Sequence, residues 1–396
     1  MSKYLIVGNG VAGTTAAENI RKHDSEGSIT IVTDEDLAFY YRIRINEFIS
    51  GDINEQDLLA KKDKWYMDSG IDLSLNTRIT GADAEKKTLI TANGESIPYE
   101  KLLIATGSHS FIPPIKGSDK QGVFSIRDIG DARNIIQYAR DVEEIVVIGG
   151  GLLGLEAGNA FIKMGKKVMV VEFFSRLLPR QLDEDGARRL QAIMEGMGFS
   201  FRLGARTQGI EGDDKIKEVR LEGDECLSAQ MVVISAGVRP NMELAEPLGI
   251  EYDKGIKVNE RLMTNKPDIF AAGDVAEFQG MPYGIWPAAM EQGKIAGSNM
   301  AGGDMVYSGT TMANILKVVG IDLASAGEID ADNKFESRIL SNENVYKKIV
   351  LDNKRIIGCI MLGDTKTFNK ITRLIAEKED ISGIKDQILT DDFKFD

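Results

Sequence analysis

The chain contains one sequence motif twice, and this duplication constrains its fold more than any other feature. Residues 4–13 read YLIVGNGVAG, and residues 145–154 read IVVIGGGLLG. Each copy is a short apolar strand that runs into three glycines with the spacing GxGxxG, followed by apolar residues at helical spacing. Each predicted helix leads to a second apolar strand that ends in acid, at Asp34 and Glu35 in the first copy and at Glu172 in the second. This order predicts an α/β fold with parallel strands.

The glycines of both copies stand where a dinucleotide-binding turn of the Rossmann type needs them: Gly8, Gly10, Gly13, Gly149, Gly151 and Gly154. The first glycine of each set allows a tight turn, the second lets the backbone approach a diphosphate, and the third lets the helix pack closely on the strand. An acid at the end of the second strand accepts hydrogen bonds from ribose and repels a 2′-phosphate, so Glu172 favours NADH over NADPH. Two copies in this context predict two bound dinucleotides.

Later strands of the chain end in glycine-containing segments, as expected where ligands bind at the carboxyl edge of a parallel sheet. Residues 101–108 (KLLIATGS) and 231–241 (MVVISAGVRPN) extend the duplication, whereas residues 267–278 (PDIFAAGDVAEF) have no copy. The candidate ligand residues at these strand ends are Ala105, Thr106, Gly107, Gly237, Gly273 and Asp274.

These segments predict three domains, the first of which is split. Residues 1–115 and 243–305 form one dinucleotide-binding domain, and residues 116–242 form the second, inserted into it. Residues 306–396 contain strands that alternate apolar and polar positions and then a helix near Phe368, so they form a smaller α+β domain. The predicted fold is therefore two nested Rossmann-like domains followed by an α+β domain.

Composition excludes several classes of protein. With 48 Lys and Arg against 61 Asp and Glu, the net charge of −13 argues against nucleic acid and anionic membranes as partners. No apolar run approaches the roughly 20 residues that span a bilayer, and no targeting segment is evident, so a cytoplasmic protein is expected. Two cysteines and two histidines leave too few ligands for a structural metal site or an iron–sulfur cluster.

The order of motifs from residue 4 to residue 302 resembles the glutathione-reductase-like family of pyridine nucleotide-disulfide oxidoreductases. The resemblance implies that the first glycine motif, with Asp274, binds FAD and that the second, with Glu156 and Glu172, binds NADH. Many family members have a ribose-binding acid where this chain has Thr33, so the resemblance leaves Asp34 and Glu35 both open for that role.

The segment 284–297 (GIWPAAMEQGKIAG) predicts a helix whose amino terminus faces the flavin in the resembling family. Pro287 suits the first helical position, and the small residues that follow allow close packing. The positive end of a helix stabilises an anionic reduced flavin without a proton donor. Trp286 either covers the flavin or fills the core.

Disulfide reductases of this family carry their cysteine pair in the region that corresponds to residues 37–49 (LAFYYRIRINEFI), which has no cysteine here. Cys226 lies in a charged hairpin and Cys359 in an apolar strand, and both are expected to be buried or half-buried. Electrons should therefore pass from the flavin directly to an external acceptor.

The stretch YYRIRINEF resembles a segment of ferredoxin and rubredoxin reductases, and resembles still more the NADH:rubredoxin oxidoreductases related to assimilatory nitrite reductase. Arg42, Arg44 and Glu47 match that segment, and Arg42 is a further candidate cofactor contact. Where ferredoxin reductases have a lysine that pairs with the counterpart of Glu156, this chain has Glu47. Either one carboxyl then has a raised pKa or an arginine lies between the two. We hypothesise that Arg44 is the cationic partner, so the candidate catalytic residues are Arg44, Glu47 and Glu156.

The function implied is an NADH-dependent flavoprotein of the rubredoxin–NAD reductase type, with FAD and NAD as cofactors. Rubredoxin is the expected small carrier, and ferredoxin or dioxygen are alternative acceptors. An FAD- and NADH-binding redox sensor for a protein partner is an alternative of another class. The sequence leaves open whether the chain forms a homodimer.

Overall fold

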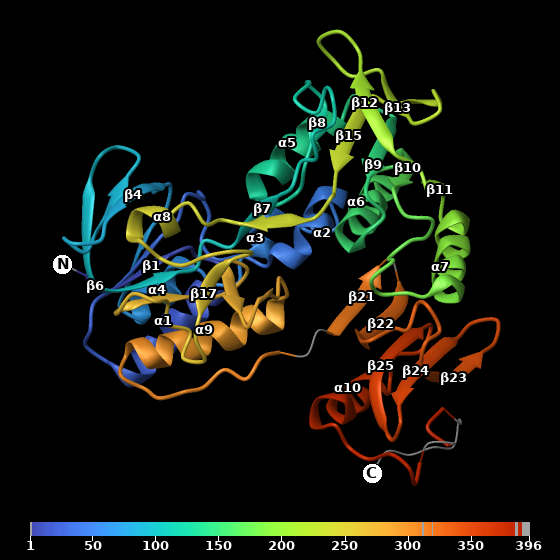
Figure 1. Cartoon of the computed structure of the whole chain (residues 1–396). Coiled ribbons are helices and arrows are strands. Elements are labelled where there is room, and N and C mark those ends of the chain that lie inside the picture. Colours follow the sequence, from blue (N-terminus) through green and yellow to red (C-terminus); the bar gives the residue numbers. More distant parts are fainter. Residues whose placement is uncertain (1, 311–312, 319, 385–386, 390–396) are drawn as a thin grey trace. The chain divides into compact units, whose positions relative to one another are not determined.

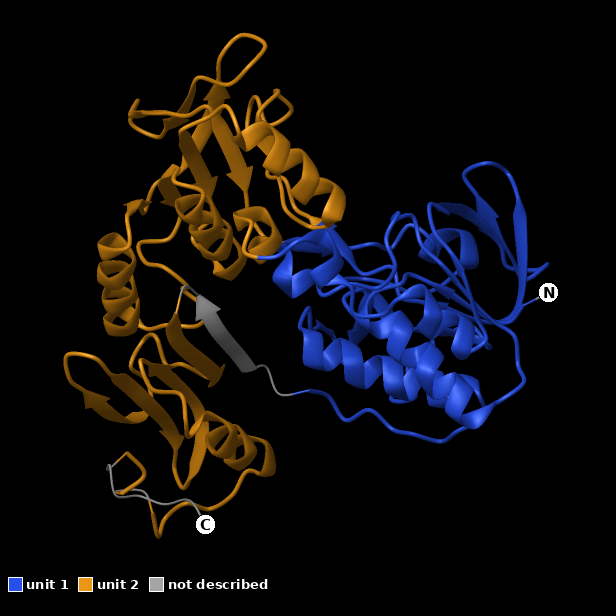
Figure 2. Cartoon of the chain, turned by 180° about the vertical axis from the view of Figure 1, so that it is seen from behind, with its two compact units in different colours: residues 1–45, 53–109, 238–310 blue, residues 46–52, 110–237, 311–396 orange. Residues whose placement is uncertain are grey.

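The computed structural model describes residues 2–310, 313–318, 320–384 and 387–389. The chain divides into two compact units, shown in Figure 2. Unit 1 comprises residues 1–45, 53–109 and 238–310, and unit 2 comprises residues 46–52, 110–237 and 311–396. The predicted division into three domains stays a prediction. None of the described helices is both long and apolar enough to cross a membrane.

Unit 1 is built on a seven-stranded sheet with the order β3-β2-β1-β6-β5-β4 and β18 paired to β6 (Figure 1). The strands β1, β2, β3, β6 and β18 pair in parallel, and β4 and β5 are antiparallel. The bounds are β1 Ser2–Val7, β2 Ile29–Val32, β3 Ile71–Ser74, β4 Ile79–Asp83, β5 Thr88–Thr91, β6 Ser96–Ile104 and β18 Ile269–Ala271. The apolar runs of β1 and β18 are buried, as expected of central parallel strands.

Two long helices of unit 1 pack tightly because small residues line their contact. α1 (Val11–His23) follows the first glycine motif, and α9 (Trp286–Met300) comes from the segment predicted to be helical. A Cβ added at Gly293 would lie 2.4 Å from the Ala12 carbonyl oxygen, and one at Gly297 would lie 2.3 Å from that of Ala16. The predicted close packing of this helix is therefore present, although Pro287 is its second residue and not its first.

Short elements complete unit 1. They are η1 Arg42–Arg44, α3 Glu55–Leu58, α4 Asp63–Asp68, β7 Ser108–Ser110, β16 Val238–Pro240, α8 Ala245–Leu248, β17 Ile256–Val258, β19 Ala276–Phe278 and β20 Met281–Pro282. β7 pairs with β16, and β17, β19 and β20 form a small sheet.

Unit 2 contains a parallel sheet with the order β11-β10-β9-β15-β8. Its elements are α2 Ile45–Ser50, β8 Val123–Phe124, α5 Ile129–Ala139, β9 Glu144–Ile148, α6 Leu152–Lys163, β10 Lys167–Glu172, α7 Glu184–Gly196, β11 Phe199–Leu203 and β15 Met231–Ile234. A three-stranded antiparallel sheet joins it, formed by β12 Thr207–Glu211, β13 Glu218–Leu221 and β14 Cys226–Ser228. The strand, glycine turn and helix β9–α6 thus repeat β1–α1, as the duplicated motif predicts.

The carboxyl-terminal part of unit 2 is an antiparallel sheet with one helix packed on it. The sheet has the order β21-β22-β25-β24-β23, with α10 against β25. The bounds are β21 Ala313–Val318, β22 Ile321–Gly327, β23 Glu336–Ser341, β24 Tyr346–Asp352, β25 Arg355–Leu362 and α10 Phe368–Glu377. The predicted strands followed by one helix are therefore present, and residues 311–312, 319, 385–386 and 390–396 of the predicted domain lie outside the described residues.

A buried polar cluster joins this part to the preceding α/β domain. Asp183 caps the amino terminus of α7, and its Oδ2 accepts a hydrogen bond from the Tyr346 hydroxyl at 2.6 Å. The ammonium of Lys348, which is 1% exposed, lies 3.2 Å from the same oxygen and donates to the Asp330 carbonyl at 2.9 Å. Because no sequence pattern signals this pairing, only the structure reveals it.

Candidate dinucleotide sites

The glycine turn between β1 and α1 has the shape that a bound diphosphate needs. Gly8 has φ +113°, and a Cβ there would lie 2.1 Å from the Ala105 carbonyl oxygen. A Cβ at Gly13 would lie 2.0 Å from the Gly8 carbonyl oxygen. A Cβ at Gly10, in contrast, would meet no atom of the described residues within 4 Å. The first and third glycines are therefore required by the fold, and the second leaves open space before the helix, where a phosphate fits.

The turn between β9 and α6 has the same geometry. Gly149 has φ +117°, and its added Cβ would lie 2.2 Å from the Ser235 carbonyl oxygen. The added Cβ of Gly154 would lie 2.1 Å from the Gly149 carbonyl oxygen, while that of Gly151 would meet none of the described atoms within 4 Å. Both turns thus satisfy the steric requirements for a dinucleotide, which supports the assignment of all six glycines.

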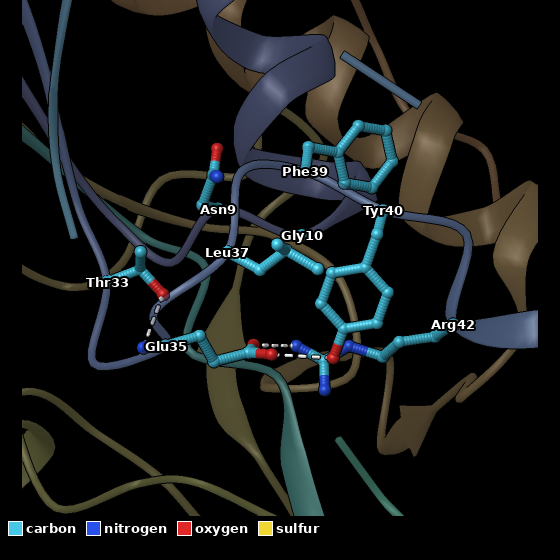
Figure 3. Close-up of a pocket in the computed structure, with 8 residues that line it drawn as sticks. All are labelled: Asn9, Gly10, Thr33, Glu35, Leu37, Phe39, Tyr40 and Arg42. Atoms are coloured by element: carbon cyan, nitrogen blue, oxygen red, sulfur yellow. Dashed lines mark hydrogen bonds and ion pairs between the residues drawn. The ribbon is translucent and has the colours of Figure 1, made fainter. Parts of the chain in front are cut away.

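A pocket beside the first turn brings together Glu35 and residues further along the chain (Figure 3). The Tyr40 hydroxyl donates to Glu35 Oε2 at 2.6 Å, and Arg42 forms an ion pair with Glu35 Oε1. The guanidinium of Arg42 also lies 5.3 Å from the centre of the Tyr40 ring. Thr33 lines the same pocket, whereas Asp34 is exposed and is not among the lining residues. Of the two acids left open, Glu35 therefore lines the pocket beside the first turn, and its role as the ribose ligand stays a prediction.

Asn9 is a polar residue of this pocket that the sequence analysis passed over. Its Oδ1 accepts a hydrogen bond from the Tyr66 hydroxyl at 2.9 Å, and that hydroxyl accepts one from the Phe39 amide at 3.1 Å. Its Nδ2 is buried and has no hydrogen-bond partner among the described residues. A buried donor without a partner is costly, so this amide fits a site that a polar ligand such as FAD completes. The signal available in the sequence was its place between Gly8 and Gly10.

The return segment places Gly273 and Asp274 at the carboxyl end of β18, next to that of β6. Asp274 Oδ2 accepts a hydrogen bond from the Ser108 hydroxyl at 2.8 Å, and the Gly273 amide donates to the buried Gln292 side chain at 2.8 Å. These residues therefore lie together at one sheet edge, as predicted.

The other predicted strand-end residues take part in local hydrogen bonds. Thr106 exchanges two hydrogen bonds with Asn241, both at 2.8 Å. Gly107 and Gly237 both have positive φ, at +69° and +99°. Ala105 is buried, and its carbonyl oxygen packs against Gly8. Ala105 and the Thr106 amide nitrogen therefore lie close to the first turn.

Trp286, at the start of α9, belongs to an aromatic group and not to the deep core. Its ring stacks on those of Phe39 and Tyr41, with centroid distances of 6.0 Å in each case. Trp286 is half-buried, and Tyr41 is 40% exposed. This exposure agrees with a covering role, which stays a prediction.

Glu172 is the last residue of β10 and lies beside the second glycine turn. Its side chain is 6% exposed, and its two carboxylate oxygens accept hydrogen bonds from the Gly150 amide at 2.6 Å and the Phe174 amide at 2.9 Å. Each oxygen keeps a lone pair, so the carboxylate can still receive ribose hydroxyls. Phe173 and Phe174, which the sequence analysis did not single out, are 62% and 54% exposed.

Glu156 lies on α6, close after the second turn, and its partner is Asn46. Asn46 Nδ2 donates to Glu156 Oε2 at 3.4 Å. Burial raises the pKa of Glu156 to about 7, while the Asn46 hydrogen bond lowers it. The sequence analysis expected a raised pKa from a neighbouring carboxylate, but the cause is burial. Arg44 donates to the Asp57 carbonyl at 3.2 Å, and its pairing with Glu47 or Glu156 stays a prediction.

The two cysteines lie on strands β14 and β25, outside residues 37–49. Cys359 is buried in β25, and burial raises the pKa of its thiol to about 12. Cys226 is exposed, which corrects the expectation that it is buried or half-buried. The reason is strand alternation in β14, because the neighbouring Leu227 takes the inward-facing position.

Comparison with known proteins identifies the family. Residues 2–293 match the pyridine nucleotide-disulphide oxidoreductase family, and residues 313–379 match the rubredoxin NAD+ reductase C-terminal domain. The chain belongs to the pyridine nucleotide-disulphide oxidoreductase family. The predicted oxidoreductase class and the cofactors FAD and NAD are therefore confirmed at the level of this family.

Individual members of the family match over almost the whole chain. The nitrite reductase [NAD(P)H] of Bacillus subtilis is 36% identical over 96% of this chain and 48% of its own length. The NADH-rubredoxin oxidoreductase of Clostridium acetobutylicum is 31% identical over 97% of each chain. The crystal structure of the Clostridium acetobutylicum enzyme has a TM-score of 0.82, 30% identity and 96% coverage of both chains. This match confirms the predicted fold.

The matched lengths differ between these relatives. The chain spans about half the length of the nitrite reductases of Bacillus subtilis and Escherichia coli, with 48% and 45% of each covered. Membership of the family therefore identifies the cofactors, and the electron acceptor is a separate question.

Proposed function

We propose that this chain is an NADH-dependent flavoprotein reductase that passes electrons directly to a small iron-containing carrier protein, rubredoxin. FAD, when bound, accepts a hydride and can release the two electrons singly. Similarity to an NADH-rubredoxin oxidoreductase over 97% of both chains supports this acceptor. So does the matching carboxyl-terminal domain at residues 313–379.

One observation carries the proposal: two complete dinucleotide turns occur in a chain whose thiols lie elsewhere. Gly10 and Gly151 each leave room for a phosphate. The segment that holds the cysteine pair in disulfide reductases has none, and Cys359 is buried in a different domain. Thiol–disulfide exchange needs an accessible thiolate with a second thiol as its partner, whereas the exposed Cys226 lies on β14 and Cys359 is buried in β25. A cysteine relay is therefore disfavoured, and direct transfer from the flavin is favoured.

The residues around the two turns would bind and orient the cofactors. Glu35, oriented by Tyr40 and Arg42, would accept hydrogen bonds from the FAD ribose, and Asp274 would bind the FAD chain between its rings. The positive end of α9 would face the flavin, with Trp286 covering it. Hydride transfer then requires orientation and exclusion of water, without a protein acid or base.

An acceptor screen tests the proposal. FAD-loaded protein is mixed with NADH in a stopped-flow instrument, and the reduced protein is then offered rubredoxin, ferredoxin, dioxygen or a nitrite reductase domain. We expect NADH to bleach the flavin absorbance rapidly, and we expect rubredoxin to reoxidise the reduced flavin faster than the other acceptors do. A long-lived reduced complex that ignores every carrier would contradict the proposal and favour a redox sensor.

Electron supply to a nitrite reductase is the second candidate. The 36% identity with the Bacillus subtilis nitrite reductase, of which the chain spans 48%, favours it. In that case a nitrite reductase domain, and not rubredoxin, would reoxidise the flavin fastest in the same screen.

A further inference from the structure

Asn46 presents an unusual hydrogen-bonding state beside Glu156. Its Nδ2 donates to Glu156 Oε2 at 3.4 Å, yet its Oδ1 is buried and accepts no hydrogen bond from the described residues. Leaving a buried acceptor unpaired is unfavourable. The structure therefore calls for a donor at this oxygen.

Glu156 takes its hydrogen bond from the neutral amide of Asn46, and the basic residue in the last turn of its helix is engaged with another group. Lys163, at the end of the same helix, pairs with Asp52 at 2.6 Å. Glu172, at the end of the adjacent strand β10, accepts hydrogen bonds from two backbone amides. A half-buried carboxyl in this setting is stabilised in its protonated form. Burial raises its pKa to about 7 accordingly.

We propose that Asn46 and Glu156 form a neutral acid–amide pair, in which the carboxyl proton of Glu156 is donated to Asn46 Oδ1 while Asn46 Nδ2 donates to Glu156 Oε2. The proton comes from solvent and returns to it when Glu156 ionises. The pair gives the orphaned Oδ1 its donor and leaves both side chains uncharged. The 3.4 Å separation of Asn46 Nδ2 and Glu156 Oε2 is long for a hydrogen bond, and closing the pair shortens it.

The neutral pair makes Asn46 a positioning residue for NADH, acting through Glu156. This role rests on the proposed binding of NADH at the second turn. α6 begins at Leu152, so Glu156 lies just beyond the first turn of the helix whose positive end would bind the diphosphate. An ionised Glu156 would offset that positive end and repel the diphosphate. Keeping the carboxyl protonated therefore favours dinucleotide binding.

Infrared difference spectroscopy on the FAD-loaded protein tests the pair itself. Wild type minus Glu156→Gln at pH 6 should show the C=O stretch of one protonated carboxyl. Asn46→Ala should move that band to higher frequency, since the acid loses its acceptor, while the exposed control Asn369→Ala should not. The proposal would be overturned if the carboxyl C=O band is absent, or if its frequency does not change in Asn46→Ala.

Calorimetric titration with NAD+ tests the consequence. Wild-type affinity should fall about two- to fivefold between pH 6 and pH 8.5, and that of Glu156→Gln should stay constant. A pH-independent wild type with an intact infrared band would overturn the positioning role but not the pair. Failure of every variant to bind NAD+ would instead count against the proposed function, and the infrared result would still decide the pair.

Discussion

The Gly150 amide donates a hydrogen bond to the carboxylate of Glu172 at 2.6 Å, so the predicted ribose acid also braces the glycine turn of its own site. The second carboxylate oxygen holds the Phe174 amide at 2.9 Å. One buried side chain therefore fixes both the turn and the segment after β10. This dual role makes the effect of substitutions at Glu172 distinctive.

Replacing Glu172 with Ala should lower the free energy of unfolding by about 1–3 kcal/mol, because two amides lose their acceptor. Glu172→Gln keeps one acceptor oxygen and should lose less stability, while its preference for NADH over NADPH should weaken. Thermal unfolding and NADH against NADPH titrations measure the two effects. An Ala variant as stable as wild type would show that the bracing role is wrong.

Alanine at Gly151 and at Gly149 should have opposite consequences. The Gly151 Cβ would enter open space, so the variant should fold and keep FAD but bind NADH roughly tenfold more weakly. The Gly149 Cβ would lie 2.2 Å from a carbonyl oxygen at φ +117°, so that variant should be unstable. Flavin content and NADH titration separate them, and equal behaviour of the two would contradict the steric assignment.

Removing both thiols should leave flavin reduction and carrier reduction intact. In the variant Cys226→Ser, Cys359→Ala, the exposed and the buried cysteine are replaced by residues that suit each environment. Stopped-flow rates within about twofold of wild type are expected, since neither thiol lies on the proposed route. A large loss of carrier reduction with normal flavin reduction would instead indicate a cysteine relay.

The buried pair of Asp183 and Lys348 should respond asymmetrically to mutation. Asp183→Ala leaves the Lys348 ammonium buried without its counter-ion and should lower the free energy of unfolding by about 3–5 kcal/mol. Lys348→Met should lower the free energy of unfolding by a smaller amount, since Asp183 keeps the Tyr346 hydroxyl and the Gly186 amide as hydrogen-bond donors. Urea unfolding of both variants and of the double variant measures this order. A double variant less stable than Asp183→Ala would contradict it.

Glu156 should make stability fall as pH rises. The pKa of this carboxyl is raised to about 7 in the folded chain. Above the ordinary value near 4.3 the unfolded chain releases the proton while the folded chain keeps it, so stability declines until the folded form also ionises near pH 7. Between pH 5 and pH 8, wild type should lose up to about 3 kcal/mol relative to Glu156→Gln. If the free energy of unfolding changes with pH in the same way for both proteins, Glu156 is ionised over this whole pH range and the prediction is wrong.

Local sequence patterns predicted the parts of the site that depend on neighbouring residues. The helices after the two glycine motifs and the strand before Gly273 lie where the patterns place them. The steric demands of Gly8 and Gly149 arise within one strand–turn–helix unit, so spacing alone reveals them. The inward position of Leu227, which leaves Cys226 exposed, depends on the neighbouring strands of its sheet and was missed.

Hydrogen bonds between side chains far apart in the sequence could not be predicted from the spacing of motifs. Asn46 and Glu156 are 110 positions apart, and Asp183 and Tyr346 are 163 apart. Which polar groups are buried together depends on how whole domains pack, and burial in turn sets the pKa of Glu156. The sequence by itself therefore determined that the chain carries two dinucleotide-binding glycine motifs and that residues 37–49 contain no cysteine. Only the tertiary structure decided which carboxylate accepts hydrogen bonds from backbone amides and which carboxyl has its pKa raised by burial, because both depend on residues far apart in the sequence.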